Sequence, residues 1–265
     1  MRFFAFILVL FFAGTGARAQ ANALSYYESG QYHQAIELGE SELDTDRVAR
    51  AENLVFAARS RLALIDLGRS ENHKRDAKAA LADAEKAMKL DPNNAEAHLM
   101  KVAALGILAR GMSKMKSFRK GIAGKSRRHI EVAMELDPQS AWARAMLGMW
   151  HLEIIRRGGK FGARVTGANA DEGAKDCALA YQSKNFDAGM GTQCGLALLI
   201  SQQDFRDEAV SILRQASQPG ISPIAYNIAM SERAREILDI LDHEGLQAAR
   251  ERALIYLNYT ASDRS

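Results

Sequence analysis

Proline, cysteine and alternating β-branched segments are all scarce in this chain of 265 residues. It contains four prolines and two cysteines, which excludes a disulfide-rich domain and a zinc site made from two cysteine pairs. No run alternates β-branched and polar residues, so no half-exposed strand is predicted. The six histidines are scattered without a His-Glu-x-x-His motif, and Gly-x-Ser-x-Gly is missing. We therefore predict no metal site, no cofactor and no enzymatic activity.

Long apolar runs are missing too, except at the N-terminus. Arg2 precedes an unbroken apolar run over residues 3–13, and small residues at positions 17 and 19 follow it. This pattern is typical of a secretory leader cleaved after Ala19. The run is shorter than the roughly 20 residues that span a bilayer, although an uncleaved anchor is the alternative. We expect a periplasmic or secreted protein with residues 1–19 removed and no stable membrane span after cleavage.

The residues that are abundant favour helices. Alanine, leucine, glutamate, lysine and arginine are frequent, and all have high helix propensity. The tripeptide Leu-Asp-Pro ends at Pro92 and again at Pro138, and proline stops a helix at the residues before it. Asn94 and Ser140 are then placed to cap the following helices. A repeated helix-turn-helix pattern in an all-α protein is typical of a solenoid.

A second pattern resembles a known repeat family. Gly30, Tyr32 and Ala35 have the spacing of Gly-x-Tyr-x-x-Ala, which is similar to the turn of a tetratricopeptide repeat. This resemblance implies a right-handed α-solenoid of four to six helical hairpins over residues 20–218. Residues 219–265 would then be capping helices that cover the last apolar face.

The middle of the chain is similar in layout to regulator-of-microtubule-dynamics proteins. Residues 112–167 combine a basic extended helix, Leu-Asp-Pro, an alanine-rich segment with Leu-Gly-x-Trp-His, and an arginine-rich insert. The similarity implies the helical fold. It does not imply microtubule binding here, because the predicted leader exports the chain.

The tetratricopeptide resemblance also implies a concave groove for a peptide or a partner helix. In that family the groove is formed mainly by the first helix of each hairpin. Some of the residues that the resemblance assigns to it can equally belong to the core. The predicted groove residues are Leu99, Ala103, Ile107, Ala145, Met149 and Leu152.

Two basic inserts extend the repeats, near residues 110–128 and 156–168. No acid occurs between Lys101 and Glu131. The interval from Pro92 to Pro138 exceeds the tetratricopeptide repeat's period of roughly 34 residues by about a dozen. The first insert is either a solvated helix extension or a surface that binds anions. Nucleic acid is not expected, since the chain is exported and Phe118 is the only aromatic residue in that insert.

The second insert, over residues 156–164, is rich in arginine and glycine. We expect it to be a loop, without the Gly-Lys-Ser/Thr of a nucleotide-binding loop. Glu153 precedes it, and we expect this residue to form a helical salt bridge with Arg156 or Arg157. The candidates for anion binding in both inserts are Arg119, Lys120, Lys125, Arg127, Arg128, Arg156, Arg157 and Arg164.

The two cysteines lie on either side of a predicted helix turn near Asn185. Cys177 and Cys194 are about equally far from it, so they are neighbours in an antiparallel hairpin. In an exported protein a disulfide between them is possible. Buried separate thiols are the alternative if helix rotation keeps the two Cβ atoms apart.

These observations lead to two functional hypotheses. The first is a tetratricopeptide-type scaffold for protein–protein interaction in the cell envelope, with a protein or peptide partner in the groove. The alternative is a binder of anionic envelope components, such as phospholipid or cell-wall polymer, through the basic inserts.

Overall fold

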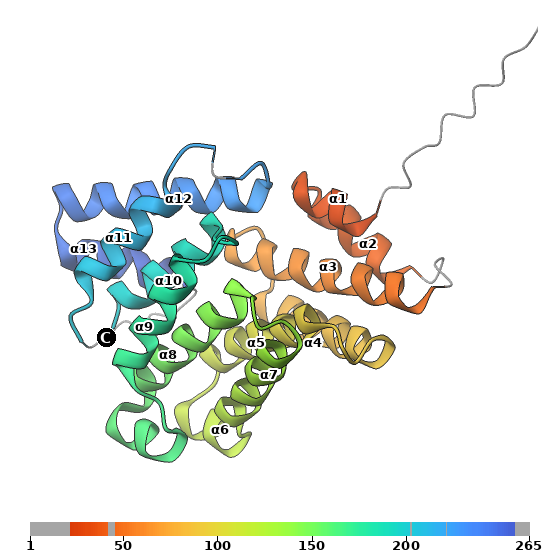
Figure 1. Cartoon of the computed structure of the whole chain (residues 1–265), viewed down its shortest axis with the longest axis horizontal. Coiled ribbons are helices and arrows are strands. Elements are labelled where there is room, and N and C mark those ends of the chain that lie inside the picture. The colour runs from red at the N-terminus through yellow and green to blue at the C-terminus, as the bar shows by residue number, and fades with distance from the viewer. Residues whose placement is uncertain (1–21, 42–45, 202, 221, 258–265) are drawn as a thin grey trace, which may run out of the picture.

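The computed structural model describes residues 22–41, 46–201, 203–220 and 222–257, and the predicted leader and its cleavage site lie outside them. The described residues contain thirteen helices and no strand, which confirms the all-α prediction (Figure 1). The helices are α1 (Ala23–Glu28), α2 (Tyr32–Glu40), α3 (Arg47–Asp66), α4 (His73–Leu90), α5 (Ala95–Arg110), α6 (Lys114–Arg119), α7 (Ile122–Leu136), α8 (Ala141–Thr166), α9 (Ala170–Tyr181), α10 (Ala188–Leu199), α11 (Arg206–Ala216), α12 (Ala225–His243) and α13 (Leu246–Tyr256).

The helices pack as successive hairpins of an α-solenoid. The pairs are α1/α2, α3/α4, α5/α7, α8/α9, α10/α11 and α12/α13, with the short α6 between α5 and α7. The first helices of the pairs also contact one another in order, from α1 through α3, α5, α8 and α10 to α12. They therefore form a continuous inner row.

The predicted Leu-Asp-Pro turns have the expected caps. Helices α4 and α7 end before Asp91 and Asp137. The Asn94 Oδ1 atom accepts a hydrogen bond from the backbone of the first turn of α5 at 2.9 Å. The Ser140 Oγ atom does the same for α8 at 3.2 Å. These bonds satisfy backbone donors that the start of a helix leaves unpaired.

The second basic insert differs from the prediction. We expected a loop over residues 156–164, but α8 continues through them to Thr166. The helix is interrupted at Gly159, whose φ of 53° and ψ of −147° are not helical. Glycine adopts a positive φ without the steric cost of a Cβ. Helix propensity on both sides of this residue thus gives a kinked helix where composition alone indicated a loop.

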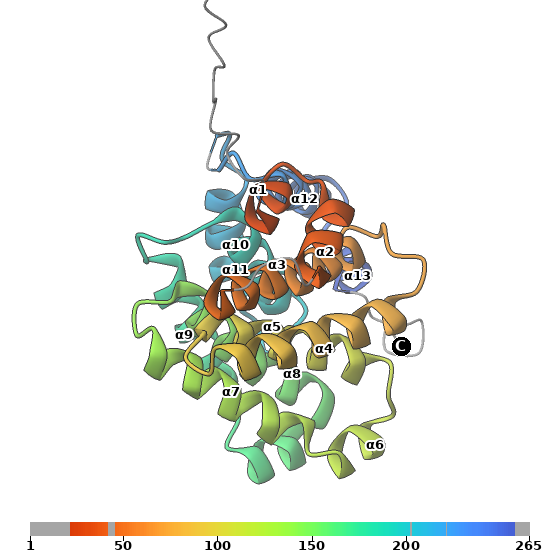
Figure 2. The ribbon, with the colours of Figure 1, turned by 90° about the vertical axis from the view of Figure 1, so that its right-hand side faces the viewer.

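The ends of the solenoid meet. Helix α12, predicted only as part of a C-terminal cap, also contacts α1. Both views place α1 and the start of α12 beside each other (Figures 1 and 2). Tyr226 and Met230 of α12 belong to the same buried apolar cluster as Tyr27 and Tyr32 of the first hairpin. The inner row of helices is therefore closed into a ring.

The two cysteines are joined. Cys177 of α9 and Cys194 of α10 form a disulfide with Cα atoms 5.9 Å apart, and both are buried. Gly148 lies against this region, because a Cβ at that position would be 2.9 Å from the Cys177 Sγ atom. The bridge links the fourth hairpin to the fifth, so the prediction that the two cysteine helices form one hairpin around Asn185 was wrong: α9 pairs with α8, and α10 pairs with α11.

Candidate functional site

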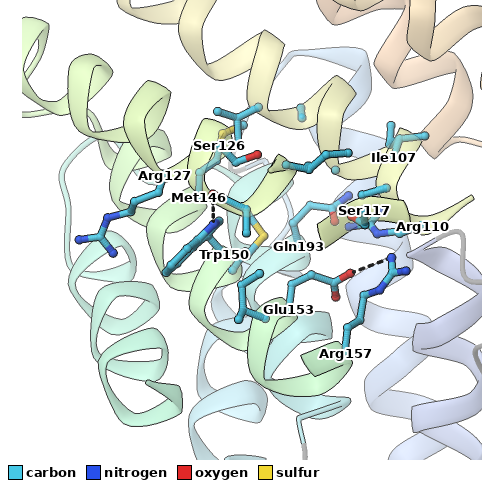
Figure 3. Close-up of a pocket in the computed structure, with 18 of the residues that line it drawn as sticks. Ile107, Arg110, Ser117, Ser126, Arg127, Met146, Trp150, Glu153, Arg157 and Gln193 are labelled. Atoms are coloured by element: carbon cyan, nitrogen blue, oxygen red, sulfur yellow. Dashed lines mark hydrogen bonds and ion pairs between the residues drawn. The ribbon is translucent and has the colours of Figure 1, made fainter. Parts of the chain in front are cut away.

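A half-open chamber of about 980 Å³ lies along the inner row of helices (Figure 3). Its walls come from α3, α5, α8, α10 and α12, with α6 and α7 on one side. Pockets for small molecules have volumes of roughly 300–1,000 Å³. The chamber is therefore large enough for a small molecule or for a short segment of another chain.

Small residues on α5 leave this space open. Ala103 and Gly106 lie one turn apart on its inner face, and apart from its chain neighbours and the backbone of α5 no atom lies within 4 Å of a Cβ built at Gly106. Across the space, α8 contributes the longer side chains of Met146, Met149 and Ile154. Methionine side chains are flexible and adapt to irregular apolar ligands. The wall is therefore apolar and adaptable.

Trp150 connects the chamber wall to α7. Its Nε1 atom donates to the carbonyl oxygen of Ala123 at 3.0 Å. The guanidinium of Arg127 lies 5.2 Å from the centre of the indole ring, and its Nε atom donates to the carboxylate of Glu131 at 2.6 Å. Figure 3 shows Arg127 pointing away from the other labelled side chains. Arg127 thus lies at one edge of the chamber lining and supports the indole ring of Trp150.

A polar cluster lies where the ring closes. The Asp66 carboxylate at the end of α3 accepts hydrogen bonds from Tyr226 Oη and Gln193 Nε2, both at 2.6 Å. Arg233 places Nη1 at 3.7 Å from this carboxylate and donates from Nη2 to the Asp66 carbonyl oxygen at 2.9 Å. Burial raises the pKa of Asp66, although Arg233 and the hydrogen bond from Tyr226 oppose that rise. These contacts join α3, α10 and α12.

A second carboxylate of the chamber lining, that of Asp187, is partly buried. Asp187 accepts from Trp142 Nε1 at 2.7 Å and from the backbone of Met190 at 2.8 Å. Burial raises the pKa of Asp187, and these hydrogen bonds oppose the rise. Both of its oxygens therefore have partners, so Asp187 supports the fold of the wall.

Arginine side chains give the chamber its positive charge. Arg157 of α8 donates from Nη2 to the carbonyl oxygen of Met112 at 3.0 Å, and its Nη1 lies 3.8 Å from Glu153 (Figure 3). That Nη1 atom is buried and has no hydrogen-bond partner among the described residues. Arg110 lies on the same side and donates to the carbonyl oxygen of Leu257 at 2.9 Å. The lining has five Arg or Lys residues against three Asp or Glu, so its formal charge favours an anion.

The family model of regulator of microtubule dynamics protein 1-3 matches residues 19–159, which is just over half of the chain. The chain belongs to this family. No curated protein matches it. The matched region of this family member contains α1 to α7 and α8 as far as the kink at Gly159. The α3, α5 and α8 walls of the chamber thus lie within the family region, whereas α10 and α12 lie beyond it.

The predicted groove residues divide between the chamber and the core of this family member. Ala103, Ile107 and Met149 line the chamber. The other three are buried in helix contacts and are at most 2 % exposed: Leu99, Ala145 and Leu152.

The predicted anion-binding residues also divide into two groups. Five are exposed on the outer surface, namely Arg119, Lys120, Lys125, Arg128 and Arg164. The other three, Arg127, Arg156 and Arg157, are partly buried. Arg156 and Arg157 both form ion pairs with Glu153, at 3.4 and 3.8 Å, which confirms the predicted helical salt bridge.

Sequence reasoning missed the polar cluster where the ring closes. Asp66, Gln193 and Arg233 are far apart in the chain and belong to no motif. The available signal was an acid at the end of an otherwise apolar helix stripe, which is too weak to predict a partner.

Within the described ranges, no group of three or more metal-binding side chains occurs and no helix could cross a membrane.

Proposed function

We propose that this protein is an exported binding protein whose chamber holds an anionic amphipathic molecule, such as a fatty acid or a phospholipid. The apolar chain would lie along Met146, Met149 and Ile154, and the acidic group would lie near Arg157. The single observation that carries this proposal is a chamber of about 980 Å³ with an apolar wall and more cationic than anionic side chains in its lining.

The physical argument rests on the cost of burying charge. A buried charged group is stable only when it is paired or hydrogen-bonded. Glu153 contacts Arg157 at 3.8 Å, beyond normal hydrogen-bond distance. An entering carboxylate or phosphate would act as a further acceptor for the cations that line the chamber, and charge-assisted bonds of this kind are about twice as strong as neutral ones. Neither a neutral lipid nor a cationic molecule would provide this gain.

A second candidate is the tetratricopeptide-type scaffold that binds a partner peptide. Its support is that Ala103, Ile107 and Met149, assigned to the groove by that resemblance, all line the chamber. The contact between α1 and α12 disfavours an extended peptide that crosses the whole inner face. A short peptide or a chain terminus would be the matching occupant.

We also propose that the protein works in the periplasm or outside the cell. The support is the leader pattern over residues 1–19 and the Cys177–Cys194 disulfide, because disulfides persist in oxidising compartments. The name of the family refers to microtubules. Microtubule binding is no part of this proposal, since an exported chain would not meet them.

The test is to purify the protein from its own cell envelope, extract it with organic solvent and identify co-purified molecules by mass spectrometry. We expect an anionic amphipathic molecule. Gly106→Trp should remove it by filling the chamber, with the circular dichroism spectrum unchanged. Arg157→Met should weaken binding of a fluorescent long-chain fatty acid about ten- to a hundredfold, the loss expected for a hydrogen bond to a charged group.

Arg214→Met is the matched control, because Arg214 is exposed on α11 and does not line the chamber. An extract without amphipathic molecules, together with fatty-acid binding that Gly106→Trp leaves intact, would refute the proposal. Capture of a peptide that Gly106→Trp abolishes would favour the scaffold instead.

A further inference from the structure

Four large apolar side chains gather on the surface at one edge of the chamber. Met115 and Phe118 of α6 are 65 % and 55 % exposed, and Phe161 and Val165 of α8 are 66 % and 52 % exposed. All four line the chamber, and the Phe118 and Phe161 rings are 6.0 Å apart between centroids. Single exposed apolar residues are ordinary, but a contiguous group at the opening of an apolar cavity marks an interaction site.

The kink at Gly159 builds this group. After it, α8 turns back, so that a Cβ at Gly162 would lie 3.1 Å from the carbonyl oxygen of Ile154. The hydrogen bond from Arg157 to Met112 holds the start of α6 against α8. Two segments that are about forty residues apart in sequence are thereby joined. We call residues 113–121 and 160–166 together the docking tip.

The charge of the docking tip has one sign. No acid occurs between Lys101 and Glu131, or between Glu153 and Asp171. The cations of the docking tip are exposed around the apolar group, and they are Lys114, Lys116, Arg119, Lys120, Lys160 and Arg164. Long Lys and Arg side chains can keep their charge in the headgroup region while apolar neighbours enter the bilayer.

We propose that the docking tip inserts its four apolar side chains into the surface of a bilayer rich in anionic lipids. Anionic headgroups complement the cations, and the acyl region receives the apolar side chains. A second copy of the chain would bring two basic surfaces together, which is unfavourable. An acidic protein would match the cations but would leave the apolar group without a matching surface. The proposal is independent of what fills the chamber.

The test is sedimentation of the chain from residue 20 onward, which contains every described helix, with lipid vesicles. We expect it to pellet with phosphatidylcholine vesicles that contain phosphatidylglycerol, and to stay in solution with phosphatidylcholine alone. Lys116→Glu/Lys120→Glu should reduce binding by well over tenfold, since each cation near an anionic surface contributes about fivefold. Lys74→Glu/Lys78→Glu, on exposed positions of α4, is the matched control and should keep more of the binding.

The apolar contribution needs its own variants. Phe118→Ser/Phe161→Ser keeps every charge and should abolish the binding that survives high salt, whereas Val48→Ser, 53 % exposed on α3, should not. Phe118→Trp should give an indole that brominated lipids quench. Absence of quenching, or equal binding by the double serine variant at high salt, would overturn insertion. Salt-sensitive capture of an acidic protein without vesicle binding would also overturn it. Solvent extraction reports the chamber content separately, so the two proposals can fail independently.

Discussion

Replacement of Asp66 by alanine should open or weaken the ring. Arg233 is 9 % exposed, and without the carboxylate it would be a buried charge with no anionic partner among the described contacts, held by the Asp66 carbonyl oxygen and by the Tyr256 ring 4.1 Å away. Breaking one partner of a buried pair costs about 3–5 kcal/mol. Burial already raises the pKa of Asp66, so its removal also relieves a desolvation cost. We therefore expect a loss near the lower limit, about 3 kcal/mol of unfolding free energy.

Urea denaturation followed by circular dichroism measures this loss, and small-angle scattering measures whether the ring opens. Asp239→Ala is the matched control, because Asp239 is exposed and pairs only with His243 of the same helix turn among the described contacts. The control should leave the midpoint unchanged. Asp66→Ala/Arg233→Met should recover part of the lost stability, since no charge then stays buried. Two results would refute the role of Asp66 in closing the ring: a loss of stability no larger than that of the control, or additive effects of the Asp66 and Arg233 substitutions in a double-mutant cycle.

Three further outcomes are expected. His98 and His129 face each other with Nδ1 atoms 2.9 Å apart, and burial lowers the pKa of His129 from 6.5 to about 4. Protonation of His129 therefore favours the unfolded chain. Urea titrations should show that the free energy of unfolding falls by about 1–2 kcal/mol as the pH drops from 6.5 to 4, a value reduced because the histidine is partly exposed to solvent. His129→Gln should make the free energy of unfolding depend less on pH over this range. Gly39→Ala should lower the free energy of unfolding by about 1–3 kcal/mol, because the alanine Cβ would lie 2.5 Å from a carbonyl oxygen of α3. An unchanged midpoint of thermal denaturation would contradict this close approach. Cys177→Ser/Cys194→Ser should lower the unfolding free energy by about 3 kcal/mol, and a reducing agent should destabilise only the parent chain.

Local sequence was sufficient for the helices and their turns. Asn94 and Ser140 cap the helices predicted for them, because capping depends on a side chain and a backbone donor three residues apart. The salt bridges of Glu153 likewise follow from helical spacing alone. The loop predicted at residues 156–164 was wrong because glycine and arginine composition does not distinguish a kinked helix from a loop.

The sequence by itself thus determined an all-α chain of hairpins and the position of its turns. The tertiary structure decided that the hairpins close into a ring, where Asp66 meets Tyr226 and Arg233. It also decided that Gly106 faces an open chamber and that Phe118 meets Phe161. Helix formation depends on residues up to four positions apart, whereas ring closure depends on small rotations summed over all the hairpins. No local pattern records that sum.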